Sequence, residues 1–227
     1  MSEQVIYGDT AYYGVELINR SGNGALPVGE HDFAEAMDRC VLVDKTMFIA
    51  DVLDADASVV ACCRPEGFGK SMNLSMLKAF LERPAVGKVD QGPFAGSQIW
   101  DADGGRYRDE FARYPVISLD FSGAARRGAS VAGVVRDALS GECARLLAFL
   151  EAPDLPRDKV RHIERVARGV ASDAEADSVL GMLIELLEMA CDEQVVLLVD
   201  GYDAAWLGHF AMRDACGSCP AEPLDRV

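Results

Sequence analysis

The segment Gly67-Phe68-Gly69-Lys70-Ser71 constrains the fold of this chain more than any other feature, because of what flanks it. The apolar run Ser58–Cys63 precedes it and predicts a buried strand. Residues 70–84 follow with apolar side chains at helical spacing and a terminal proline, so a helix is expected to begin near Lys70. A strand, a glycine-containing turn and a helix N-terminus in this order are typical of phosphate-binding loops.

The chemistry expected of this loop follows from its residue types. Small residues let backbone N–H groups point at a phosphate, and Lys70 could reach the β- and γ-phosphates of a nucleotide. The hydroxyl of Ser71 could ligate Mg²⁺. The Walker A pattern, G-x-x-x-x-G-K-[ST], is matched in part, since Arg64 takes the place of its first glycine. An ordinary strand–turn–helix with a chance Gly-Lys-Ser is the alternative.

A second apolar run, Val195–Val199, ends at Asp200 and predicts another buried strand. An aspartate in this position is typical of the Walker B motif, where it holds the water shell of the Mg²⁺ ion. Taken alone, Asp200 is more simply explained as a strand-end residue that caps a turn. The order of the two motifs along the chain favours nucleotide binding.

The chain as a whole alternates predicted strands with predicted helices. The expected strands are 58–63, 116–121 and 195–200. The expected helices lie near 33–37, 70–84, 130–151 and 158–169, with one following Thr46 that has Phe48 and Leu53 on one face and another opening at Ser172. This order predicts an α/β fold with a mostly parallel sheet that has helices on both faces. Ligands are expected at the carboxyl ends of the strands.

Several segments follow one template, namely Val43-Asp44-Lys45-Thr46, Arg64 to Leu77, Pro115 to Ser122 and Val195 to Asp203. Together they resemble the AAA-ATPase-like family of bacterial proteins. The resemblance covers residues 31–206 and implies a P-loop NTPase-like three-layer sandwich. It implies that Arg64, Gly67, Phe68, Gly69, Lys70 and Ser71 bind ATP, and that Ser71 and Asp200 hold Mg²⁺. Members of the family often carry a PD-(D/E)XK nuclease-like domain after the ATPase.

The chain departs from the family pattern in three places. Glu66 and Gly67 replace two basic residues, and the charge of Glu66 should weaken nucleotide binding. Gly201 replaces the glutamate that follows the Walker B aspartate, so hydrolysis is expected to be weak or absent and no residue is assigned as catalytic. The resemblance fades after Trp206, which suggests a truncated member, incomplete at its C-terminal side.

These departures leave a second function open, that of an inactive ATPase-like module acting through protein contacts, or of a degenerate remnant. A protein partner could then complete the sheet. The expected organisation is an N-terminal extension (1–30), a partial ATPase-like domain (31–206) and an irregular tail (207–227). Two roles also stay open: Asp120 could cap a turn or face the site, with the turn favoured, and Lys45 could face the nucleotide or pair near Asp44.

The charge and the cysteine content limit the classes of binding partner and indicate the cellular compartment. With 22 basic and 37 acidic residues the formal net charge is −15, which disfavours direct nucleic-acid binding and anionic membranes. No apolar run approaches the length of a membrane span. The seven cysteines are expected to be reduced thiols in a cytoplasm, with at least one of Cys62 and Cys63 buried. The lone Cys216-x-x-Cys219 has no partner ligands for zinc.

Overall fold

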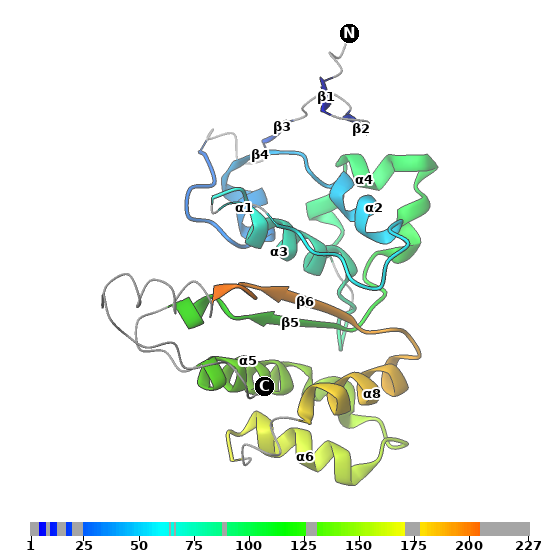
Figure 1. Cartoon of the computed structure of the whole chain (residues 1–227). Coiled ribbons are helices and arrows are strands. Elements are labelled where there is room, and N and C mark those ends of the chain that lie inside the picture. The colour runs from blue at the N-terminus through cyan, green and yellow to red at the C-terminus, as the bar shows by residue number, and fades with distance from the viewer. Residues whose placement is uncertain are drawn as a thin grey trace, which may run out of the picture. The chain divides into compact units, whose positions relative to one another are not determined.

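The computed structural model describes residues 5–7, 10–12, 17–19, 25–63, 65, 67–87, 90–125, 131–170 and 178–204. The chain divides into two compact units, Met1–Val116 and Ile117–Val227 (Figure 1). Together they hold helices and a small parallel sheet, which is compatible with the expected α/β class. None of the helices in the described ranges combines the length and apolar character needed to cross a membrane.

The first unit consists of short elements. In chain order they are β1 (Val5–Tyr7), β2 (Thr10–Tyr12), β3 (Leu17–Asn19), α1 (Phe33–Arg39), β4 (Val41–Val43), α2 (Met47–Leu53), α3 (Lys70–Leu81), η1 (Gly92–Phe94), α4 (Gln98–Asp101), η2 (Ala102–Gly104) and η3 (Arg106–Glu110). Helices α1, α2 and α3 confirm the sequence prediction. β3 comes from the predicted N-terminal extension and pairs antiparallel with β4, with Ile18 opposite Leu42.

An aromatic cluster forms the core of this unit. Phe94 lies fully buried, with its ring centroid 5.3 Å from that of Phe33 on α1 and 5.0 Å from that of Phe80 on α3. Phe111 closes the cluster, with its ring centroid 5.4 Å from that of Phe80. Edge-to-face and offset contacts at these distances stabilise aromatic cores beyond the burial of their area. The cluster therefore fixes α3 by its buried C-terminal half.

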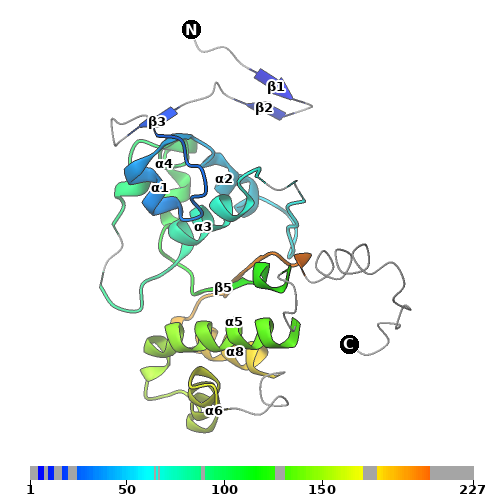
Figure 2. The same ribbon diagram turned by 90° about the vertical axis from the view of Figure 1, so that its left-hand side faces the viewer.

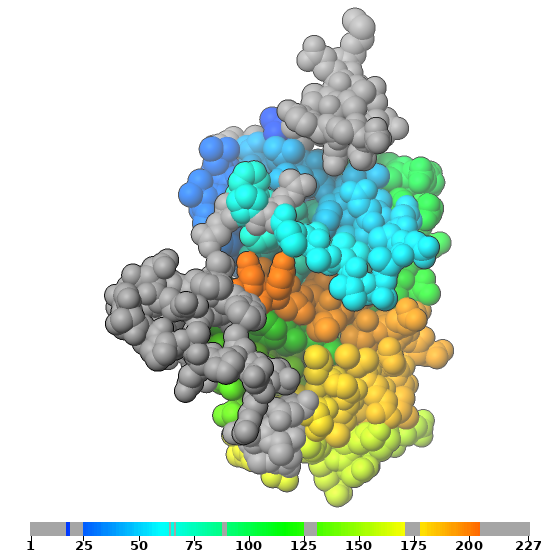
Figure 3. Space-filling view, viewed as in Figure 1, coloured from blue at the N-terminus to red at the C-terminus, as the bar shows by residue number. Residues whose placement is uncertain are grey.

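The predicted strand Ser58–Cys63 is wrong. These residues are neither helix nor strand, and all of them are exposed, including both Cys62 and Cys63. Val59 is 81% exposed and Val60 46% exposed, and this cyan stretch of the chain lies at the visible surface in Figure 3. A strand needs a neighbour for its hydrogen bonds, and no described strand pairs with these residues. An apolar run predicts burial but does not supply that neighbour.

The second unit consists of a two-stranded sheet and a set of helices. Its elements are β5 (Val116–Asp120), which starts at the unit boundary, η4 (Ser122–Ala125), α5 (Val131–Leu146), η5 (Leu147–Glu151), α6 (Arg157–Ala167), α8 (Val179–Cys191) and β6 (Val196–Asp200). β5 and β6 pair in parallel, whereas β1–β2 and β3–β4 are antiparallel. Ser172, where the last helix is expected to open, lies outside the described residues.

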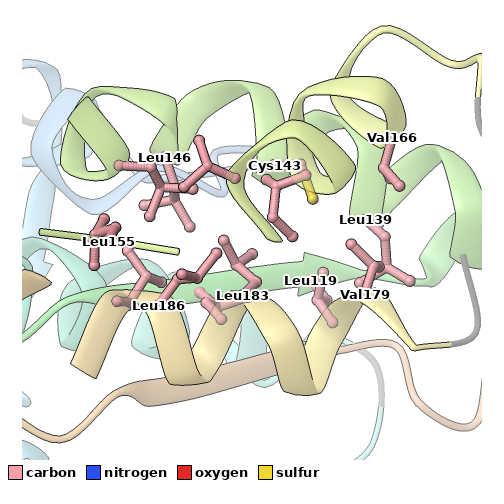
Figure 4. Packing of buried hydrophobic residues seen from close by; sticks show 14 residues of the cluster. Leu119, Leu139, Cys143, Leu146, Leu155, Val166, Val179, Leu183 and Leu186 are labelled. Atoms are coloured by element: carbon pink, nitrogen blue, oxygen red, sulfur yellow. The ribbon is translucent and has the colours of Figure 1, made fainter. Parts of the chain in front are cut away.

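Helices α5 and α8 lie between the sheet and α6 in this unit (Figures 1 and 2). Buried side chains of β5, α5, η5, α6 and α8, together with Leu155, form one apolar cluster (Figure 4). Its members are Ile117, Leu119, Leu139, Cys143, Leu146, Leu150, Leu155, Val160, Ile163, Val166, Val179, Leu183, Leu186 and Leu187. The spacing of the apolar residues on α5 and α8 therefore gives each helix a buried stripe.

The buried carboxylate of Glu142 accepts a backbone hydrogen bond from β5. Phe121 donates its backbone N–H to the carbonyl of Asp200 at 2.9 Å, so that N–H points toward β6. Backbone N–H groups alternate between the two sides of a strand, and Ser118 therefore points away from β6. Its N–H is accepted by Oε2 of Glu142 on α5 at 2.8 Å. Glu142 thus occupies the position that a further strand would need at β5.

Candidate functional site

Two glycines shape the turn before α3. Gly67 has φ +79° and Gly69 has φ +76°, a left-handed conformation that glycine adopts at low cost. Gly69 is the N-cap of α3, and apart from the chain neighbours no described residue comes within 4 Å of the position that a Cβ would take at either glycine. The turn therefore has open space on its surface, as a loop that takes up a ligand requires.

The N-terminus of α3 is electrostatically suited to an anion. The N-cap makes no side-chain hydrogen bond to the helix, and the first turn holds no acidic residue. The first N–H groups of any helix lack partners within the helix and carry partial positive charge. Because the first turn of α3 carries no acidic side chain of its own, the charge at this end of the helix favours a phosphate.

Lys70 and Ser71 are the first two residues of this helix. Nζ of Lys70 donates a hydrogen bond to the carbonyl oxygen of Pro65 at 3.2 Å, so the side chain folds back over the turn. Ser71 is half-buried, and Phe68 projects from the turn with 58% of its surface exposed. Arg64 and Glu66 lie outside the described residues. The structure thus brings Gly67, Phe68, Gly69, Lys70 and Ser71 together on one turn.

Asp200 belongs to the second unit, where it ends β6. Its Oδ1 accepts the backbone N–H of Gly201 at 2.9 Å. Asp120 ends the neighbouring strand β5, and its Oδ1 accepts the N–H of Ser122 at 2.8 Å. Asp120 therefore caps the turn after its strand, which is the role that the sequence favoured.

Gly201 is packed against the turn that follows β5. Its φ is +63°, and a Cβ built on it would lie 2.6 Å from the backbone nitrogen of Ser122 and 3.1 Å from the carbonyl carbon of Phe121. Contacts this short with backbone atoms cannot be relieved by rotating a side chain. Position 201 therefore requires glycine for a steric reason that the sequence alone did not reveal.

The motif Val43-Asp44-Lys45-Thr46 proves to be a structural clamp. Oδ1 of Asp44 accepts the N–H and the hydroxyl of Thr46 at 2.8 and 2.6 Å. Oδ2 of Asp44 accepts the N–H of Gln98 at 2.9 Å, and the buried Thr46 Oγ1 accepts that of Ile99 at 3.1 Å. Both side chains therefore cap the N-terminus of α4. Lys45 lies exposed between them.

The described residues contain no metal site built from protein side chains alone. Within the ranges that the structure covers, no group of three or more His, Cys, Asp or Glu side chains could hold a metal ion. A magnesium ion brought in with phosphates needs fewer protein ligands, because one or two side-chain oxygens, phosphates and water complete its shell.

The comparison with protein families gives a match over most of the chain. The model of a family described as Predicted AAA-ATPase matches residues 27–216. No curated protein and no solved structure matches the chain. The matched range includes the turn before α3, the clamp that caps α4 and the end of β6.

Proposed function

Since the chain belongs to the predicted AAA-ATPase family, we propose that it binds ATP with Mg²⁺ at the turn before α3. The observation that carries the proposal is the N-terminus of α3. It begins at a left-handed glycine, has no side-chain cap and has no acid in its first turn. Helix N-termini of this kind bind phosphate through backbone N–H groups and the helix dipole.

Each residue of the turn has a role in this proposal. Gly67 and Gly69 give the phosphates access to the backbone N–H groups, and Arg64 and Phe68 bind beside them. Lys70 exchanges its hydrogen bond to the Pro65 carbonyl for the phosphates, a stronger, charge-assisted contact.

Ser71 would hold the Mg²⁺ ion that accompanies the phosphates, through its hydroxyl. The ion supplies positive charge that neutralises the phosphates.

We propose that hydrolysis is weak or absent. A side chain at position 201 would collide with the backbone of Ser122, so the residue after Asp200 offers no carboxylate to polarise water. Loss of a general base typically lowers a rate by about 10²–10⁴-fold. Binding without turnover is therefore the expected behaviour.

The test is a titration of the purified protein with a fluorescent ATP analogue in the presence of Mg²⁺. Lys70→Ala should weaken binding by about tenfold or more, because a hydrogen bond to a charged group contributes about 1.5–3 kcal/mol. Lys78→Ala is the matched control, since Lys78 lies in the last turn of the same helix and should leave affinity unchanged. A folded wild-type protein that binds no analogue would refute the proposal.

A second candidate function is an inactive ATPase-like module that a protein partner completes. Two observations favour it: the apolar residues Val59 and Val60 are exposed, and among the described strands only β5 pairs with β6. An added strand would extend the β6 side toward a P-loop-type sandwich. Light scattering of the protein copurified with its bound partner, with and without ATP, separates the two functions. An inactive module should remain in the complex with its partner whether or not nucleotide binds.

A further inference from the structure

Two adjacent cysteines, Cys62 and Cys63, are exposed directly ahead of the turn before α3. The other cysteines in the described residues, Cys40, Cys143 and Cys191, are buried. Burial, with the neighbouring Glu142, raises the pKa of the Cys143 thiol to about 12, so that thiol stays protonated. Thiol reactivity follows exposure and thiolate content. Reagents in solution should therefore reach Cys62 and Cys63 before the three buried thiols.

Covalent geometry decides what such a pair can form. The Cα atoms of adjacent residues are about 3.8 Å apart across a trans peptide, whereas relaxed disulfides join Cα atoms about 4.4–6.8 Å apart. A direct disulfide between Cys62 and Cys63 would be strained and easily reduced. One atom inserted between the two sulfurs lengthens the link and relieves that strain. The pair is thus better suited to a bridging thiophilic atom than to a disulfide.

The number of available protein ligands indicates which thiophilic atom could bridge the two sulfurs. A structural zinc ion takes four protein ligands, and no described group of three or more His, Cys, Asp or Glu side chains could hold a metal. An organic trivalent arsenical, R–As=O, needs only two thiols. In the reaction two S–H bonds break, two As–S bonds form, and the oxygen leaves as water with both protons. No atom changes its oxidation state.

We propose that Cys62 and Cys63 form a dithiol site for monosubstituted trivalent arsenicals, and that filling this site weakens nucleotide binding. The effect on nucleotide binding rests on the proposed function. Cys63 is two residues from Pro65, whose carbonyl oxygen accepts a hydrogen bond from the Lys70 ammonium at 3.2 Å. Two extended residues span about 7 Å at most. A bridged adduct therefore places a bulky group, and a restrained backbone, beside the lysine expected to bind phosphate.

The experiment uses the full chain and phenylarsine oxide as the probe. The background variant is Cys216→Ser/Cys219→Ser, because the tail holds a second closely spaced pair outside the described residues. One equivalent should bind, resist glutathione, be released by dithiothreitol and map to the peptide containing Cys62 and Cys63. Adding Cys62→Ser or Cys63→Ser should abolish this adduct, whereas adding Cys191→Ala should not. The adduct should lower affinity for the fluorescent ATP analogue by about tenfold, or about 1.4 kcal/mol.

Other outcomes would overturn the inference in separable ways. An adduct that survives Cys62→Ser, no stable adduct, or a loss of two hydrogens that indicates a disulfide would refute the dithiol site. A mapped adduct with unchanged nucleotide affinity would refute its effect on the turn. If the untreated protein binds no nucleotide, the proposed function fails and the effect on binding fails with it. A mapped adduct would in that case still establish the site.

Discussion

A Cβ atom added at Gly201 would lie 2.6 Å from the backbone nitrogen of Ser122. The residue also has φ +63°, which costs a non-glycine residue about 1–2 kcal/mol. We therefore expect Gly201→Ala to lower the free energy of unfolding by about 2 kcal/mol or more, since strain at a special φ adds to overpacking. Urea unfolding followed by circular dichroism measures this change.

Gly141→Ala is the control for this substitution. Gly141 lies within α5, and apart from the helix's own backbone no described residue comes within 4 Å of its Cβ position. Alanine there should raise the free energy of unfolding by up to about 1 kcal/mol, because glycine is a poor helix former. Gly201→Glu should destabilise the protein as Gly201→Ala does and should not create ATP hydrolysis. A stable Gly201→Glu protein with ATPase activity would contradict the steric argument.

The clamp formed by Asp44 and Thr46 gives a second prediction. Thr46→Val keeps the shape of this fully buried side chain but removes the acceptor for the Ile99 N–H and the donor to Asp44. Unsatisfied buried polar groups cost about 1–3 kcal/mol each, so Thr46→Val should lower the free energy of unfolding by about that amount. Chemical denaturation is the measurement.

Lys45→Ala is the matched control for the clamp, because Lys45 lies between the two residues but is exposed. Its effect on stability should stay within about 0.5 kcal/mol. The same variant decides the question that the sequence left open. Nucleotide affinity equal to wild type would place Lys45 outside the binding site, and a tenfold loss would place it within.

Local patterns predicted the helices well and the long-range contacts poorly. Apolar periodicity identified α3 and α5, since a helix satisfies its own backbone hydrogen bonds. The strand predicted at Ser58–Cys63 is wrong because a strand depends on a distant neighbour, which composition does not specify. The hydrogen bond between Asp44 and Gln98 spans 54 residues. No local pattern in the sequence signals it.

The turn before α3 was the most predictable part of the candidate site. Its glycines and lysine lie between positions 67 and 70, so one short motif specifies their geometry. The sequence identified Gly201 only as a missing glutamate. Its packing against Ser122 involves a segment about eighty residues away in the chain, and a single sequence does not reveal that approach.

Glu142 gives a third prediction. This carboxylate is 8% exposed, accepts the Ser118 N–H at 2.8 Å and pairs with Arg145 at 2.7 Å. Removing the carboxylate takes away the acceptor of the Ser118 N–H, which costs about 1–3 kcal/mol. The Arg145 side chain is 33% exposed, so solvent screens its charge, and Glu142→Ala should lower the free energy of unfolding by about 1–3 kcal/mol. Glu142→Gln keeps an acceptor for Ser118 and should cost less.

The exposed Glu188 on α8 is the control for Glu142, and Glu188→Ala should change stability by less than about 0.5 kcal/mol. Urea unfolding of the three variants gives the ranking. Equal stability of Glu142→Ala and Glu188→Ala would show that the carboxylate does not hold β5 to α5.

Tyr107 gives a prediction for alkaline pH. Its buried hydroxyl donates to Oδ2 of Asp54 at 2.5 Å, and this hydrogen bond, burial and the charge of Asp54 raise its pKa from 10.0 to about 12. Between these pH values the folded protein binds more protons than the unfolded chain, so stability should fall as pH rises. Cys143, raised from 9.0 to about 12, contributes with the same sign.

Tyr107→Phe isolates the tyrosine's share of this pH dependence. At pH 8 the variant should be less stable by about 1.5–3 kcal/mol, the contribution of a hydrogen bond to a charged group. That deficit should shrink as pH rises toward 12, because the wild type loses the same stabilisation when Tyr107 ionises and the variant has no phenol to ionise. Urea unfolding midpoints at several pH values, with absorbance titration of the phenolates, measure both effects. A constant difference between variant and wild type across this range would show that Tyr107 titrates alike in the folded and unfolded chain.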